Sequence, residues 1–265
     1  MKKVLTIAGS DSGGGAGIQA DLKTFMAFGT HGMSAITAIT AQNTVGVQSA
    51  HPLPRDLIRE QIKSVADDIG VDAVKTGMLA SSEIVQTVAD AVREFTLPNL
   101  VVDPVMIAKS GDPLLAEEAR ETIREELLPL AAVITPNLHE ASELLDMEID
   151  TIDDMEDAAR ALQSLGCQWV VVKGGHLTGE EAVDVLFDGN RIYHERAEYI
   201  KSENTHGTGC TFSSAIAAGL AKGNQPLEAI RNAKRYINEA IREGLDIGAG
   251  HGPTNHLVGL ESRWF

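Results

Sequence analysis

Short apolar runs alternate with longer amphipathic stretches along almost the whole chain, and this alternation constrains the fold more than any other feature. The short runs have the length and apolar content of buried strands, whereas the longer stretches carry apolar residues at the three-and-four spacing of helices. Repeated strand–helix units of this kind pack around a largely parallel sheet. The pattern therefore predicts an α/β fold built on a mostly parallel central sheet.

The expected elements can be placed by residue number. Strands are predicted at 4–8, 33–39, 73–75, 100–103, 133–135, 169–173, 183–187 and 191–193, and helices at 19–28, 55–67, 82–95, 117–127, 155–165, 210–221 and 227–243. Within the segment 182–199, Gly189 and Asn190 stand between two β-rich runs, which predicts a hairpin at one side of the sheet. No linker interrupts the pattern, so residues 1–265 are expected to form a single domain.

The charge and cysteine content limit the partners and the compartment. With 22 Lys+Arg against 38 Asp+Glu, the formal net charge is −16, and the chain lacks the positive surface that nucleic acids and anionic membranes require. The two cysteines are too few for a disulfide framework, and the longest apolar stretch, 127–134, is too short to span a bilayer. We therefore expect a cytoplasmic protein with small-molecule partners, and no nucleic acid or membrane among them.

Polar and glycine-rich segments follow nearly every predicted strand. Because the carboxyl ends of parallel strands meet at one edge of an open α/β sheet, these segments are expected to surround a shared site. One loop of this composition is ordinary, but agreement among so many favours a functional site. The segments are 9–17, 40–43, 75–78, 103–105, 135–140, 173–176 and 205–211.

Three common motifs are excluded by the residues at their key positions. A P-loop beginning at Gly9 would require Lys and then Ser or Thr where Gly15 and Ala16 stand. The glycine pairs spaced for dinucleotide binding lack the third glycine, and the segment 139–143 lacks the second histidine of a zinc-protease helix. A phosphate site in this chain must therefore be built in another way.

The turn from Gly207 to Cys210 has the features of an anion site. Glycines directly before a small-residue helix expose the N–H groups of its first turn and let a ligand approach closely. The same residues could instead serve only to pack a tight turn against the helix. Both interpretations remain open at the level of the residues alone.

Charged residues at the predicted strand ends could complete a phosphate site. Asp103 and Glu140 suit the one or two carboxylates that Mg²⁺ uses beside nucleotide phosphates, although either could be a helix cap or a surface charge. Lys75 and Lys173 could offset phosphate charge, although a lysine that ends a strand can simply be solvated.

Long stretches of the chain resemble the hydroxymethylpyrimidine/phosphomethylpyrimidine kinase family of the ribokinase-like superfamily. The matching segments are 8–21, 41–44, 75–78, 102–106, 108–111, 135–137, 173–176 and 204–211. The resemblance extends from Val4 to about Leu257 and includes the segment 250–253. Motifs of this length and order are highly specific.

The resemblance implies a fold and an activity. The fold would be a three-layer α/β/α sandwich forming one kinase domain, and the cofactors would be ATP and Mg²⁺. The enzyme would phosphorylate 4-amino-5-hydroxymethyl-2-methylpyrimidine to its monophosphate and then to the diphosphate, in thiamine biosynthesis. We also expect a homodimer.

The resemblance also implies a role for individual residues. For the substrate, Gln42 would hydrogen-bond the aminopyrimidine, and the pocket would include Gly9, Asp21, Met78 and Val105. For the metal, Asp103 and Glu140 would organise Mg²⁺. Lys173, Asn137 and Thr208 would bind the nucleotide. The anion hole for the transferred phosphoryl group would be formed by Gly207, Thr208, Gly209 and Cys210. The segment 108–112 would form a flap over the site.

Cys210 stands where most sugar kinases of the superfamily carry the aspartate that activates an alcohol. A thiol has a pKa of about 8.5 that a helix N-terminus lowers, so Cys210 could act as a modest base. We expect its neutrality to matter as much, because a carboxylate there would repel a phosphate-monoester substrate by several kcal/mol, as an order of magnitude. A small residue that merely fits the turn is the alternative.

Two other functions remain open. A pyridoxal or pyridoxine kinase of the same subclass can share the turn from Gly207 to Cys210 and takes a similar ring. A non-catalytic pyrimidine-binding regulator on a kinase scaffold would bind the ligand without ATP turnover, but the full set of metal, phosphate and acceptor residues argues against it.

Overall fold

The computed structural model of the protein describes residues 1–106, 118–175 and 181–260. Nine strands of the described chain form one sheet, in the order β3-β2-β1-β4-β5-β6-β7-β8-β9. All neighbours from β2 to β7 pair in parallel, whereas β3, β8 and β9 pair antiparallel at the two sides. The predicted, mostly parallel sheet is confirmed. The strands are β1 (Lys3–Asp11), β2 (His31–Gln42), β3 (Val47–Pro52), β4 (Ala73–Thr76), β5 (Leu100–Val102), β6 (Val133–Ile134), β7 (Trp169–Gly174), β8 (Glu181–Phe187) and β9 (Ile192–Glu198).

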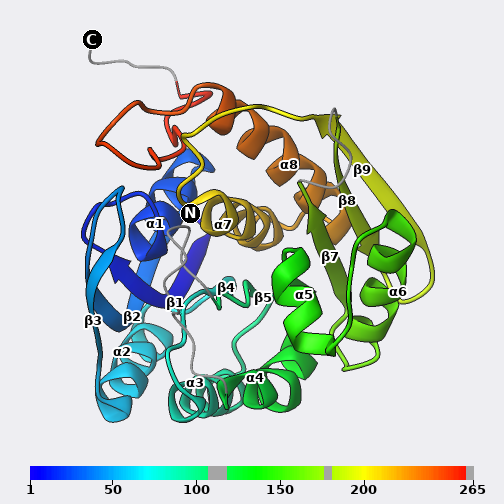
Figure 1. Ribbon diagram of the computed structural model, residues 1–265. Helices are drawn as coiled ribbons and strands as arrows, with labels where there is room; N and C mark the ends of the chain where they lie inside the picture. Colours follow the sequence, from blue (N-terminus) through cyan, green and yellow to red (C-terminus); the bar gives the residue numbers. More distant parts are fainter. Residues whose placement is uncertain (107–117, 176–180, 261–265) are drawn as a thin grey trace.

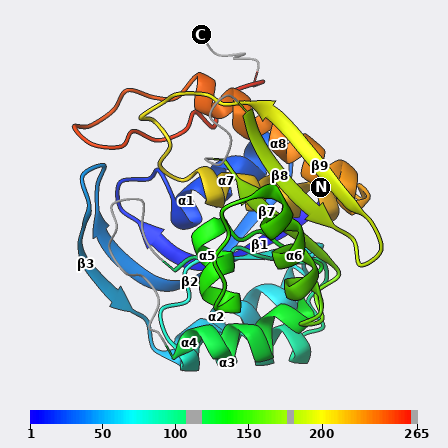
Figure 2. The same cartoon turned by 45° about the vertical axis from the view of Figure 1, so that its right-hand side comes forward.

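Helices cover both faces of the sheet, which gives three layers (Figure 1 and Figure 2). Alternate residues of each central strand point to opposite faces, so that in β5 Leu100 and Val102 join one core and Val101 joins the other. The first core includes α2 (Arg55–Asp68), α3 (Ser82–Glu94), α4 (Ala119–Thr122), α5 (Leu138–Leu145) and α6 (Ile152–Gln163); the second includes α1 (Gly17–Ala27), α7 (Thr208–Ala221) and α8 (Pro226–Arg242). The three-layer α/β/α sandwich is confirmed.

Helix α7 is buried on nearly all sides because it lies between the sheet and α8 (Figure 1). Every residue from 211 to 221 is buried, and most of these residues are Ala, Gly or Ser, which let neighbouring elements approach closely. At Gly219, an added Cβ would lie 2.9 Å from the Cβ of Ala229 on α8. The N-terminus of α7 is therefore held firmly at the carboxyl edge of the sheet.

Two elements lie outside the predicted set. Strand β3 extends the sheet beyond β2, and its residues are mostly exposed, so they lack the apolar pattern by which strands are found. Helix α5 is only 8 residues long and begins within the segment that we expected to be a loop. Strand β2 also continues to Gln42, so residues 40–42 belong to a strand and not to a loop.

Other elements follow the prediction with shifted ends. The hairpin at one side of the sheet is confirmed as β8 and β9. The helix predicted at 117–127 has its first residue outside the described residues. The described part forms α4 and the π-helical turn η1 (Ile123–Leu127), and the 3-10 turn η2 (Leu128–Leu130) continues beyond the predicted end. Helix α6 begins before the predicted residue 155, because Thr151 and Asp154 form a capping box. None of the described helices is both long and apolar enough to cross a membrane.

His256 hydrogen-bonds the first part of α7 from the C-terminal segment. Its Nε2 lies 2.9 Å from Thr211 Oγ1, and the residue is only 5% exposed. Burial, together with the charge of Lys23, lowers the pKa of His256 to about 4. His256 is therefore neutral in the folded protein at pH 7.

Acid is expected to destabilise the fold through His256. In the unfolded chain, a histidine has a pKa of about 6.5, whereas in the folded protein the pKa of His256 is about 4. Protons therefore bind the unfolded state more readily between these two values. The contribution of the neutral His256 to the free energy of unfolding is complete above pH 6.5 and is lost as the pH falls toward 4. The full loss from this group is about 3 kcal/mol. Urea unfolding at pH 7 and pH 5 measures it: His256→Gln should lose about 2 kcal/mol less than wild type over this interval. The same loss in both proteins would contradict this role.

Candidate active site

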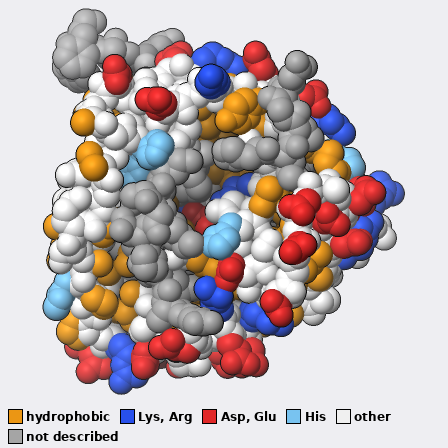
Figure 3. Space-filling model, viewed as in Figure 1, with side chains coloured by type: hydrophobic (Ala, Val, Ile, Leu, Met, Phe, Trp, Pro, Cys, Tyr) orange, Lys and Arg blue, Asp and Glu red, His pale blue; other side chains and the backbone are white. Residues whose placement is uncertain are grey.

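A cavity of about 620 Å³ opens at the carboxyl edge of the sheet, between the loops that follow the parallel strands and the start of α7. Figure 3 shows this face of the molecule hollowed near its centre, with charged side chains inside the hollow. The volume is typical of sites for small molecules. Among the described residues predicted for the site, Asp21 and Lys75 do not line this cavity, whereas the following residues do: Gly9, Gln42, Met78, Asp103, Val105, Asn137, Glu140, Lys173, Gly207, Thr208, Gly209 and Cys210.

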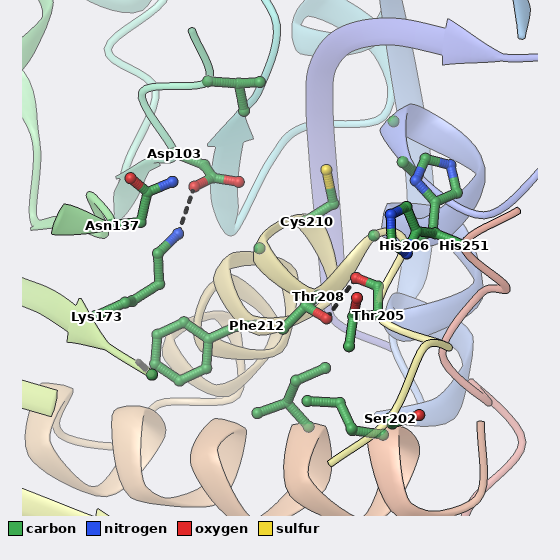
Figure 4. Close-up of a pocket in the computed structure, with 18 of the residues that line it drawn as sticks. Asp103, Asn137, Lys173, Ser202, Thr205, His206, Thr208, Cys210, Phe212 and His251 are labelled. Atoms are coloured by element: carbon green, nitrogen blue, oxygen red, sulfur yellow. Dashed lines mark hydrogen bonds and ion pairs between the residues drawn. The ribbon is translucent and has the colours of Figure 1, made fainter. Parts of the chain in front are cut away.

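Lys173, near the end of β7, lies beside Asp103, which follows β5 (Figure 4). The carboxylate of Glu140, on α5, lies on another side of Lys173. Lys173 Nζ is 3.2 Å from Asp103 Oδ1 and 3.9 Å from Glu140 Oε2. Thr135 Oγ1 donates to Asp103 Oδ1 at 3.3 Å, and Ser213 Oγ lies 3.3 Å from Asp103 Oδ2, so the carboxylate is placed between the end of β6 and α7. Three charged groups from separate elements are thereby brought to one point in the cavity.

Asn137 and Glu140 form the first turn of α5 as a capping box. Asn137 Oδ1 accepts from the Glu140 N–H at 2.9 Å, and Glu140 Oε2 accepts from the Asn137 N–H at 2.7 Å. Glu140 therefore does take part in capping a helix, which was one of the two interpretations of this residue. The same carboxylate is only 7% exposed and faces Lys173, so capping and a place in the site are combined in one side chain.

The electrostatics of this cluster follow from its burial. Burial raises the pKa of Glu140 to about 7, and Asp103 adds to the effect, although Lys173 and the Asn137 N–H oppose it. Burial alone would lower the pKa of Lys173, but the two carboxylates outweigh it and the pKa is raised. Lys173 is therefore a fixed cation at physiological pH.

The carboxylates also fit a magnesium–nucleotide complex. Among the described residues, no group of three or more His, Cys, Asp or Glu side chains could hold a metal by itself. Mg²⁺ in nucleotide sites commonly takes only one or two carboxylates and completes its shell with water and phosphate oxygens. Asp103 and Glu140 supply two carboxylates to the cavity, a number that would suit such a complex.

The turn from Gly207 into α7 presents backbone amides to the cavity. Gly207 has φ of +81°, and a Cβ there would lie 1.9 Å from the Gly15 carbonyl oxygen, so only glycine fits. The Thr208 N–H donates to Thr205 O at 3.2 Å, and the Thr211 N–H donates to Gly207 O. The first-turn amides of Gly209 and Cys210 have no acceptor within the helix and are available to an anion.

Asp11 and His206 join this turn to the glycine-rich loop after β1. Asp11 accepts from the N–H groups of Gly13, Gly15 and Ala16 at 2.8–3.0 Å, and its Oδ2 lies 2.9 Å from His206 Nε2. Burial acts to raise the pKa of Asp11, but the hydrogen bonds from His206 and the amides lower it overall. The sequence places His206 in the motif but could not show its partner, which lies 195 positions away.

Cys210 is partly buried at the wall of the cavity and is a free thiol. Burial raises its pKa to about 11; Lys75 and a backbone hydrogen bond from Gly17 act in the opposite direction, and Asp21 and Asp103 add to the rise. The expectation that the helix N-terminus lowers this pKa is wrong, because desolvation is the larger effect here. Cys210 is therefore neutral at pH 7, which weakens its case as a base.

Lys75 and Asp21 lie behind the cavity wall and not in it. Both side chains are 0% exposed, and Lys75 Nζ lies 2.9 and 3.0 Å from the two oxygens of Asp21. Thr6 Oγ1 and Ser214 Oγ also donate to this carboxylate, at 2.6 and 2.7 Å. The prediction that Asp21 forms part of the substrate pocket is therefore corrected, because all its acceptor sites face protein groups. Lys75 is likewise not a solvated lysine.

One end of the cavity, which we call the acceptor end, is formed by β1, β2 and the segments that follow β4 and β5. Gly9 lies against Met78, since a Cβ at Gly9 would come within 3.0 Å of Met78 Sδ. Gln42 and Val105 line the same cavity, and Thr40 Oγ1 lies 3.1 Å from the Gln42 side-chain amide.

The opposite end of the cavity includes apolar residues that the sequence analysis missed. Phe212 of α7 (Figure 4) and Ile237 and Ile241 of α8 line it. A buried ion pair, in which Lys234 Nζ lies 2.7 Å from Asp184 Oδ2, lines it as well. In sequence, these residues are ordinary members of amphipathic elements, so only the fold could assign them to the site. The predicted flap at 108–112 and His176 lie outside the described residues.

A lysine–carboxylate cluster that faces open helix amides, in a three-layer α/β sandwich, defines a ribokinase-like small-molecule kinase. Comparison with known families refines this class. The chain belongs to the phosphomethylpyrimidine kinase family, whose model matches residues 11–255. The family shows that the chain is a kinase, and its fold agrees with this assignment.

Individual relatives cover nearly the whole chain. A Streptomyces coelicolor protein named hydroxymethylpyrimidine/phosphomethylpyrimidine kinase is 54% identical over 96% of this chain and 93% of the relative. A Bacillus subtilis protein named pyridoxine kinase is 49% identical over 97% of this chain and 96% of the relative. The structure of the ADP complex of Bacillus subtilis pyridoxal kinase has a TM-score of 0.91 and 48% identity, and covers 97% of this chain and 98% of that one.

Proposed function

We propose that this chain transfers the γ-phosphoryl group of ATP, with Mg²⁺, to 4-amino-5-hydroxymethyl-2-methylpyrimidine and then to the resulting monophosphate, in thiamine biosynthesis. The observation that carries the proposal is the position of Lys173, Asp103 and the amides of Gly209 and Cys210 between an acceptor end and an apolar end of one cavity. The family and the name of the 54% identical relative point to the same two substrates.

The residues have distinct roles in the proposed reaction. Asp103 and Glu140 hold the divalent ion, which neutralises phosphate charge when it is bound with the nucleotide. Lys173, Asn137 and Thr208 bind the nucleotide phosphates. The amides of the turn from Gly207 to Cys210 stabilise the negative charge of the transferred group, as fixed dipoles in a site with little water.

The acceptor residues orient the nucleophile in this scheme. Gln42 hydrogen-bonds the ring, and Gly9, Met78 and Val105 form the walls against which the ring packs. The hydroxyl, or the phosphate of the second substrate, is thereby directed toward the anion hole. Asp21 acts at one remove, by holding Lys75 and Ser214 behind the turn.

The chain should convert the pyrimidine alcohol in two successive phosphoryl additions. The purified protein with ATP, Mg²⁺ and the alcohol, followed by mass spectrometry, is expected to yield the monophosphate and then the diphosphate. Without a divalent ion, turnover and tight ATP binding should both be lost, because the carboxylates then repel the phosphates. Ligand binding without ATP consumption would indicate the non-catalytic regulator instead.

Pyridoxal is the competing substrate, because two of the similar proteins are pyridoxine and pyridoxal kinases. Parallel assays should therefore compare kcat/KM for the pyrimidine alcohol and for pyridoxal. A larger value for pyridoxal would overturn the substrate proposed here and leave the kinase activity in place.

We also propose that the enzyme is a cytoplasmic homodimer formed through the β3 side of the sheet. Both cysteines are free thiols, as in reducing compartments. Strand β3 is the end strand of the sheet, and Ile39 and Val45 beside it are 52% and 66% exposed. A second copy that covers this edge would remove it from water. A monomeric mass in analytical ultracentrifugation would contradict the dimer.

A further inference from the structure

The side chains of Thr40 and Gln42 lie on the same face of β2, at the acceptor end of the cavity. Residues two apart on a strand share a face, and both residues line the cavity. The backbone of Gln42 is fixed by Ser12, whose Oγ accepts from the Gln42 N–H at 2.8 Å and donates to the Gln42 carbonyl at 2.7 Å. The backbone position of Gln42 is therefore fixed, and the orientation of its side-chain amide depends on the groups around that amide.

The Thr40 hydroxyl decides which way the Gln42 amide faces. Thr40 Oγ1 lies 2.9 Å from the Ser10 carbonyl oxygen and 3.1 Å from the Gln42 amide atom at the Oε1 position. A hydroxyl has one proton, and a backbone carbonyl can only accept, so that proton goes to Ser10. Thr40 is 4% exposed, which leaves little room for water to change this arrangement.

The remaining hydrogen bond must then be donated by glutamine. Oxygen and nitrogen of a glutamine amide have the same shape, and their positions are assigned from hydrogen bonds. With the Thr40 proton committed to Ser10, the Gln42 Nε2 must face Thr40 and donate to it. The Gln42 Oε1 then faces the cavity, where none of the described residues donates to it.

We propose that Thr40 is a specificity-determining residue that fixes Gln42 as a hydrogen-bond acceptor toward the substrate ring. The inference rests on the proposed function and deepens it. A carbonyl oxygen held at this point selects a ring that carries an N–H donor, such as the exocyclic amine of an aminopyrimidine. It disfavours a ring with an oxygen acceptor at the same position, because two acceptors would then face each other without a proton.

The test compares two substrates in three proteins. The substrates are the 4-amino pyrimidine alcohol and its analogue in which oxygen replaces the amine; the proteins are wild type, Thr40→Val and Thr40→Ser. Wild type is expected to favour the amine by about 100-fold or more in kcat/KM. Thr40→Val keeps the side-chain shape but lets the Gln42 amide turn, so the preference should fall by about 10- to 100-fold, mainly through KM.

The serine variant, and the ratio of kcat/KM for the two substrates, distinguish a role in specificity from a merely structural role. Thr40→Ser keeps the hydroxyl and should restore the wild-type preference. A merely structural role for Thr40 would lower kcat/KM for both substrates and leave their ratio unchanged, and that result would overturn the inference. A wild-type preference for the oxygen analogue would also overturn it. Failure of wild type to phosphorylate either compound would instead refute the proposed function.

Discussion

A Lys75→Met variant is expected to unfold with a free energy about 3–5 kcal/mol below that of wild type. Lys75 and Asp21 are both fully buried, and the ammonium contacts both carboxylate oxygens. Methionine fills the space but leaves the carboxylate without its cation, in a place that water does not reach. Urea unfolding at pH 7, followed by circular dichroism, measures the difference.

An exposed ion pair in the same protein provides the matched control. Lys63 pairs with Asp67 on α2, and their side chains are 49% and 53% exposed. Lys63→Met removes the same charge by the same substitution, and the loss should stay below about 1 kcal/mol, because water solvates the remaining carboxylate. Equal losses in the two variants would show that Lys75 is not held as a buried ion.

A double variant separates the pair from its surroundings. Lys75→Met combined with Asp21→Asn removes both charges and keeps a group that can bond Thr6 and Ser214. It should be more stable than the sum of the two single losses by about 1–3 kcal/mol. Additive losses would mean that the two side chains do not act as a pair.

The same network explains how residues outside the cavity support the site. Asp21 belongs to α1, Thr6 to β1, Lys75 to β4 and Ser214 to α7, so one carboxylate joins four elements. Ser214 lies in the second turn of the helix whose first turn offers the amides for phosphate. Weakening this network is therefore expected to displace the anion hole as well as to destabilise the fold.

The residues that line the cavity could largely be predicted from the sequence, because the topology of a parallel sheet determines which residues lie at its carboxyl edge. Residues at or directly after the end of a parallel strand must lie at the carboxyl edge of the sheet, and this rule places both Asp103, which follows β5, and Lys173, which lies near the end of β7. The Asn137–Glu140 spacing also matches a capping box, so the start of α5 was present in the sequence and was missed because the helix is so short.

Other features depend on contacts between distant residues and could not be derived in this way. The partners Lys75 and Asp21 are 54 positions apart, and His206 and Asp11 are 195 positions apart. A lysine at a strand end gives no sign of whether it faces water or a buried carboxylate. The pKa of Cys210 was misjudged for the same reason, since its rise to about 11 comes from burial that only the packed structure defines.

Replacing Cys210 with aspartate is expected to separate the two phosphorylation steps of the proposed reaction. The alcohol is a neutral acceptor and should still be phosphorylated, whereas the monophosphate brings negative charge to the turn that holds residue 210. Two unit charges at about 4 Å repel by about 4 kcal/mol at an effective dielectric constant near 20. Lys75 offsets part of this repulsion, so we expect kcat/KM for the second step to fall by about 100-fold or more.

Cys210→Asn is the control for this prediction, because asparagine has the shape of aspartate without its charge. If the neutral state of the thiol is what admits the second substrate, Cys210→Asn should change both steps by a similar factor, and only Cys210→Asp should change their ratio. Separate assays with the alcohol and with the monophosphate measure each step. Equal losses of both steps in Cys210→Asp would show that residue 210 matters for its size in the turn. A selective loss of alcohol phosphorylation in Cys210→Asn would restore the thiol as a base, despite a pKa of about 11 that leaves it protonated at pH 7.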